Sequence, residues 1–158
     1  MNSDAFYAIL SGICFALTGL WWTVVEARKD WLANPTMRAL AGGVYASFLI
    51  PGVMSLGAQI GGENKLVWRT VFALAALTGM YFNGRLLAAQ RRLPGAGFFA
   101  RNRGLVIAVY LLVAVFGVFP ELAARSGLKP IQVEAFLISA IVLTGHGLAW
   151  DMMTRQPE

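Results

Sequence analysis

RLLAAQRRLPGAGFFARNR, from Arg85 to Arg103, separates two largely apolar parts of the chain. It is the longest interruption between apolar segments, and it holds five of the thirteen Lys and Arg residues of the 158-residue chain. On both sides of it the apolar runs approach the length of about 20 residues that a helix needs to cross a bilayer. The sequence therefore predicts an integral membrane protein in which residues 88–104 form a basic cytoplasmic loop.

The composition agrees with a membrane protein. Hydrophobic residues make up 58% of the chain and charged residues only 13%, whereas a soluble domain averages about 45–50% apolar and about 25% charged residues. The net charge of +5 would point to nucleic acid in a soluble protein. Here the basic residues cluster between apolar runs, so membrane topology and anionic lipid explain them, and we expect no nucleic-acid partner.

Five segments have the length and apolarity of membrane-spanning helices, and they predict a single-domain, all-α bundle. The predicted spans cover residues 5–25, 39–60, 66–87, 105–122 and 131–150. Pro51 predicts a kink in the second span, because proline removes one backbone N–H and clashes with the preceding turn. An alternative topology has four spans, with a segment such as the end of the first helix lying in the membrane interface.

The distribution of basic residues predicts the orientation of the bundle. Nine Lys and Arg residues fall on one side of the five crossings and four on the other. The positive-inside rule then places the N-terminus outside and the C-terminus in the cytoplasm. We therefore expect a multi-pass protein of a bacterial inner membrane.

Small residues recur at spacings of three and four in every predicted span except 105–122. Such stripes let membrane helices approach closely, or else line a pore, and the sequence leaves both interpretations open. Because residues 105–122 are mostly bulky, we expect that helix to be the most lipid-exposed member of the bundle. The predicted pore or packing face consists of Gly12, Gly19, Thr23, Ser47, Gly52 and Ser139.

His146 is the ionisable side chain to which the sequence gives most weight, because it lies about one turn inside a predicted span between two glycines. Ionisable groups in a bilayer are costly and often functional. Polar residues at the same predicted depth complete a candidate site on the cytoplasmic side: Glu26, Asn83, Arg85, His146 and Asp151. The same cluster could instead be a structural network, or a proton sensor centred on the imidazole. Near the opposite boundary, we expect Arg69, Glu121 and Glu134 to extend toward the membrane surface.

The basic loop also contains two adjacent phenylalanines. Each basic residue near an anionic leaflet adds about 1 kcal/mol of attraction, and apolar side chains can insert between headgroups. The predicted lipid-surface residues are Arg91, Arg92, Phe98, Phe99, Arg101 and Arg103. The alternative is a loop that only sets the topology.

The sequence shows no motif for a catalytic, metal or cofactor site. A single histidine and a single cysteine cannot form the clusters that zinc, haem or iron–sulfur groups require. A bundle of five helices is thin-walled for enclosing a pathway, and the stripes of small residues can supply contacts between copies. We therefore predict a homo-oligomeric channel or a transport protein for a small solute or ion. The alternatives are an accessory subunit of a larger membrane complex, and a membrane-embedded enzyme or pH or ligand sensor that uses His146.

Overall fold

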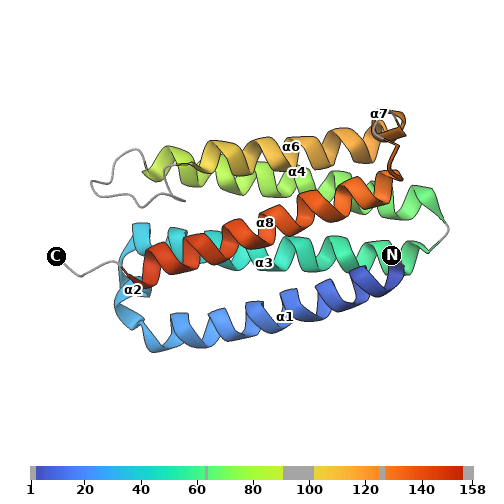
Figure 1. Ribbon diagram of the computed structural model, residues 1–158. Coiled ribbons are helices and arrows are strands. Elements are labelled where there is room, and N and C mark those ends of the chain that lie inside the picture. The colour runs from blue at the N-terminus through green and yellow to red at the C-terminus, as the bar shows by residue number, and fades with distance from the viewer. Residues whose placement is uncertain (1–2, 63, 91–101, 125–126, 155–158) are drawn as a thin grey trace.

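The computed structural model describes residues 3–62, 64–90, 102–124 and 127–154, which form an antiparallel helical bundle (Figure 1). The long helices are α1 (Ser3–Ala27), α3 (Pro35–Gly61), α4 (Lys65–Gln90), α6 (Arg103–Val118) and α8 (Pro130–Met153). Two short helices, α2 (Lys29–Ala33) and α7 (Glu121–Ala124), lie in the connections. We call the end of the bundle where α1, α4 and α8 begin the N-terminal end, and the opposite end the C-terminal end.

The connection from α1 to α3 folds back through α2. Asn34 begins α3, because its side-chain oxygen accepts hydrogen bonds from the backbone N–H groups of Thr36 and Met37 at 2.9 and 3.2 Å. This is the N-cap arrangement that satisfies the first free N–H groups of a helix. The α2 helix lies where the sequence allowed an interfacial turn, and its Trp31 ring lies 6.0 Å from that of Trp21.

The chain turns at Gly62, close before α4 begins at Lys65. Gly62 has a φ of 49°, a backbone conformation that favours glycine. Its N–H donates to the carbonyl groups of Ala58 and Gln59 at the end of α3. Because the connection between α3 and α4 is short, the two helices are adjacent and antiparallel.

Two prolines have different effects on the helices. Pro51 lies inside α3, which continues as a helix on both sides of it. By contrast, α6 ends at Val118 rather than continuing to residue 122 as the sequence predicts. The next residue, Phe119, leaves the helical conformation with a ψ of 69°. Phe119 precedes Pro120, and the proline ring disfavours the helical conformation of the residue before it.

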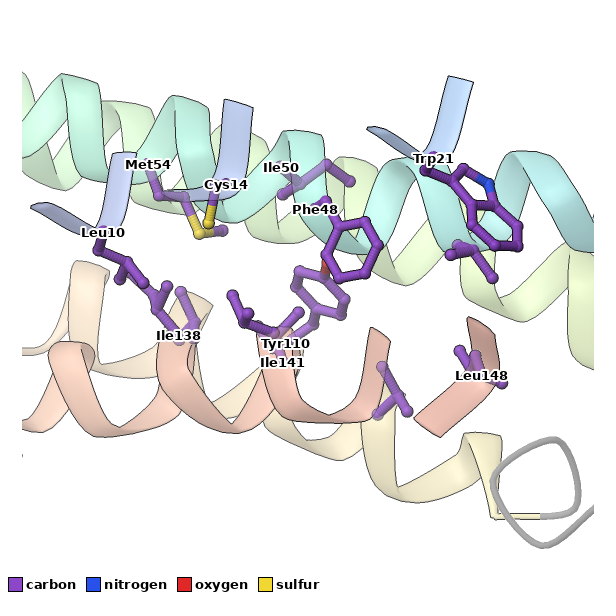
Figure 2. Packing of buried hydrophobic residues seen from close by; sticks show 14 of the residues in the cluster. Leu10, Cys14, Trp21, Phe48, Ile50, Met54, Tyr110, Ile138, Ile141 and Leu148 are labelled. Atoms are coloured by element: carbon purple, nitrogen blue, oxygen red, sulfur yellow. The ribbon is translucent and has the colours of Figure 1, made fainter. Parts of the chain in front are cut away.

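Buried apolar side chains from all five long helices form one core. Figure 2 shows Cys14, Met54, Tyr110 and Ile141 among the side chains that meet in the middle of the bundle. Tyr110 comes from α6 and is fully buried. α6 also packs against both α4 and α8, whereas α1 packs mainly against α3. The prediction that α6 is the most lipid-exposed helix is therefore wrong, and α1 is more exposed.

Three of the described helices are long and apolar enough to be candidate membrane spans: α1, α3 and α8. The described part of α6 that is apolar, residues 104–118, is shorter. The 26-residue α4 is long enough, but it contains Arg69, Asn83 and Arg85, which lower its hydropathy. The chain is thus an all-α bundle with three candidate membrane spans and a shorter apolar helix.

Candidate functional site

A cavity opens at the N-terminal end of the bundle. Its volume is about 860 Å³, and residues from α1, α3, α4 and α8 line it. Asp4, Lys65 and Lys129 contribute charge to its walls, and Tyr7 and Trp68 contribute aromatic rings. The cavity therefore combines charged and aromatic groups, a lining that suits a small polar solute better than a lipid tail.

Hydrogen bonds between helices lie beneath this cavity. The Tyr7 hydroxyl donates to the backbone carbonyl of Ile131 at 2.7 Å and so joins α1 to α8. The Gln59 amide nitrogen donates to the Ser11 hydroxyl at 2.9 Å and to the Tyr7 carbonyl at 3.2 Å, which joins α3 to α1. In a low-dielectric interior such bonds hold the helices in register, because breaking them leaves polar groups unpaired.

Arg69 joins α4 to the end of α6. Its Nε donates to the Gly117 carbonyl at 2.8 Å, and its Nη2 donates to the Val118 carbonyl at 2.6 Å. These carbonyl groups belong to the last turn of a helix, where backbone acceptors are free and the helix dipole favours a cation. Rather than extending only toward the membrane surface, Arg69 therefore caps a neighbouring helix.

Glu134 lies in a different environment from the one that the sequence predicts. Sequence depth alone predicted that it extends to the surface, but its side chain is fully buried. Neither carboxyl oxygen has a hydrogen-bond partner among the described residues, and the group lies within electrostatic reach of the Tyr7 phenol. It follows Ile131, which lines the cavity, by three positions on the same face of α8. A buried, unpartnered carboxyl group is costly, and inside a membrane such groups mark functional sites.

The predicted cytoplasmic-side cluster draws its members from α1, α4 and α8, and three of them have described contacts within their own helix. The buried Asn83 donates to the Gly79 carbonyl within α4, and Arg85 donates to the Tyr81 hydroxyl within the same helix. His146 is exposed, with its Nδ1 2.9 Å from the Val142 carbonyl and its ring against Phe48.

Two carboxylates complete that predicted set. Glu26 is exposed near the end of α1, and Asp151 is half-buried near the end of α8. No hydrogen bond or ion pair joins Glu26 to a described residue. Whether these residues act as one site stays a prediction.

The predicted small-residue face divides into a covered part and an uncovered part. Ser47 is buried, and Gly52 packs against Cys14, 3.1 Å from the position of an added Cβ. Ser139 is half-buried and donates to the Ala135 carbonyl.

The members on α1 are all exposed. Gly12, Gly19 and Thr23 face away from the bundle, and a Cβ added at either glycine would meet no other group within 4 Å. This exposed face of α1 also carries Ala16 and Glu26.

The predicted lipid-surface residues lie largely outside the described part of the chain. This applies to Arg91, Arg92, Phe98, Phe99 and Arg101. Arg103 is the first residue of α6. Contact of this segment with lipid stays a prediction.

A second cavity, of about 550 Å³, lies between α3 and α4 in the half of the bundle near the C-terminal end. Gly42, Ala46 and Leu49 form its α3 wall, and Phe82 and Arg85 lie on its α4 wall. We call it the α3–α4 groove. Its lining is mostly apolar, with one cationic side chain.

Comparison with known proteins finds permease subunits of bacterial transport systems. The chain is 28% identical over 151 aligned positions to the thiamine transport system permease protein ThiP of Brucella abortus, and the match covers 77% of this chain. The ThiP protein of Brucella suis matches to the same extent. The chain is a multi-pass membrane protein distantly related to a bacterial permease. Its match spans only 28% of the length of these relatives.

No protein-family model matches the chain. No solved structure matches it either.

Proposed function

We propose that this chain is a small-solute transport protein that works as an assembly of copies, which associate through the exposed face of α1. The observation that carries the proposal is the position of Gly12, Ala16 and Gly19 opposite the buried side of that helix. Lipid tails provide no hydrophobic drive for helix association, so close packing between small residues is a main source of attraction in a membrane. An uncovered face of this kind favours contact with another helix.

The proposed topology has five crossings, with the N-terminus outside and the C-terminus in the cytoplasm of a bacterial inner membrane. At 1.5 Å per residue, the 26 residues of α4 extend about 39 Å, which exceeds the roughly 30 Å of a hydrocarbon core. The 16 residues of α6 extend only about 24 Å, a mismatch that local thinning of the bilayer accommodates. The antiparallel order brings the two most basic connections to the C-terminal end, which supports this orientation.

Two observations support transport. The permease similarity is the first. The second is the cavity at the N-terminal end, which has charged and aromatic walls and the buried Glu134 close to its base. Buried apolar side chains fill the middle of the bundle (Figure 2). A solute pathway between copies therefore fits the structure better than one through the centre of a single chain.

The permease similarity also favours a second candidate function. In that case the chain is an accessory subunit of a larger transport system, and its exposed α1 face contacts a different membrane protein. The two candidates differ in the composition of the purified particle. Identical copies are expected for the first, and an additional partner chain for the second.

The name of the relatives provides the first solute to test. We expect cells that produce this chain to take up labelled thiamine, or a related small organic solute from a competition panel, faster than cells that lack it. Gly19→Trp should lower both uptake and the mass of the purified particle, because an indole on the exposed face blocks close approach of helices. Leu143→Trp, at a position of α8 that is also exposed, is the matched control. Uptake and mass that are unchanged in Gly19→Trp would contradict the proposal.

A further inference from the structure

The α3–α4 groove and the exposed face of α1 have complementary features. At Gly42 the wall of the groove has no side chain, and a Cβ added there would meet no other group within 4 Å. On the exposed side of α1, the small residues Gly12, Ala16 and Gly19 form a stripe beside bulky exposed side chains such as Ile13 and Leu20. Small residues on both surfaces would allow two helix backbones to approach closely, which is the geometry that stabilises helix pairs in lipid.

The charges of the two surfaces are also complementary. Arg85 lies on the wall of the groove, and its described contacts are the Tyr81 hydroxyl at 3.1 Å and the face of the Tyr81 ring, whose centroid lies 5.8 Å from its Cζ. Within the described residues, no carboxylate forms an ion pair with it. Glu26, at the end of the exposed α1 face, likewise has no described partner. An arginine fork and a carboxylate make strong, directional hydrogen bonds when they meet.

The two charged residues lie at similar depth but on helices that α3 separates. The Trp21 indole donates to the Ala41 carbonyl at 2.9 Å, so these parts of α1 and α3 are level. Glu26 is little more than one turn beyond Trp21, close to the level of Ala39, where the groove ends. α3 lies between α1 and α4 (Figure 1), and no ion pair joins Glu26 to Arg85 within one described chain.

We infer that the α3–α4 groove binds the exposed face of α1 from a second copy of this chain, with Glu26 of one copy paired to Arg85 of the next. This inference rests on the proposed function and names the surface that receives α1. The contact joins two different patches, so each copy has one donor face and one receptor groove. Repetition of such a contact gives a closed ring when the rotation between successive copies returns to the first copy. A phospholipid is the competing occupant, but it would leave Glu26 and the small residues of α1 without a role.

A charge-swap experiment tests the pairing. Native mass spectrometry in nanodiscs would measure the particle mass of the wild type, Glu26→Arg, Arg85→Glu and the double variant. We expect each single variant to associate at least about tenfold more weakly, since it places like charges together at the contact, and the double variant to recover the wild-type mass. Lys29→Glu changes the charge of an exposed residue in α2 and should leave the mass unchanged.

Filling the groove provides a second test that does not alter charge. Gly42→Leu adds a side chain in open space, so the single chain should fold and melt normally while the assembly is lost. Gly84→Leu is the matched control on α4, because its Cβ position is also open but lies outside the groove.

The outcomes separate this inference from the proposed function. A monomeric wild type would overturn both. A wild-type oligomer that is insensitive to the single charge changes, or a double variant that does not recover, would overturn the Glu26–Arg85 pairing and leave transport by an assembly standing. A phospholipid whose binding is lost in Arg85→Glu and kept in Glu26→Arg, with no change in oligomer mass, would show that lipid occupies the groove.

Discussion

The two ends of the bundle use their polar side chains differently. At the N-terminal end, Tyr7, Gln59 and Arg69 each donate hydrogen bonds to a different helix. At the C-terminal end, Asn83 and Arg85 bond only within their own helix. The exposed Arg85 guanidinium therefore remains available for contacts outside the chain, whereas the three side chains at the N-terminal end hold helices together.

Substitution of the two arginines at opposite ends should show the largest difference. Arg69→Gln removes two charge-assisted hydrogen bonds to the end of α6, and we expect a loss of about 3 kcal/mol in the free energy of unfolding. Arg85→Gln should change the stability of the single chain little, because its guanidinium is exposed. Thermal or denaturant unfolding in detergent measures both, and equal losses would contradict the comparison.

Glu134 should show an effect of the opposite sign. Glu134→Leu replaces a buried carboxyl group that has no described hydrogen-bond partner, so we expect it to stabilise the fold by about 1–3 kcal/mol. The same variant should lower solute uptake, since residues kept at a cost in stability are often kept for function. A variant that is less stable, or one that is more stable with uptake unchanged, would show that the carboxyl group has another role.

Substitution of Tyr7 and Tyr81, one at each end, should give the smallest difference in the free energy of unfolding. Tyr7→Phe removes only the hydroxyl that bonds the Ile131 carbonyl, and we expect a loss of about 1 kcal/mol in the free energy of unfolding. Tyr81→Phe removes a hydroxyl from an exposed residue and should cost less than half as much. The same unfolding measurements compare the pair, and a larger loss for Tyr81→Phe would reverse the assignment of the two ends.

Much of the fold follows directly from the sequence, because apolar runs of this length predict helices whatever their neighbours. The turn at Gly62 and the start of α8 at Pro130 were predictable for local reasons. The apolar run predicts the end of α6 four residues too late, because it does not show that Pro120 restricts the backbone of Phe119.

The candidate site was much less predictable. Depth in the membrane can be counted along a sequence, but the direction in which a side chain points depends on tertiary packing. For this reason Glu134 was expected at the surface and is buried. The small residues of α1 show the converse case, since the sequence predicted a helix-packing or pore face and the structure leaves that face exposed.

The mass of the wild-type particle in nanodiscs, measured by native mass spectrometry, tests the central claim most directly. We expect a discrete multiple of the 17.1 kDa chain mass, without a second protein. A stable monomer that retains solute uptake would contradict it, because the exposed face of α1 would then have no part in the activity.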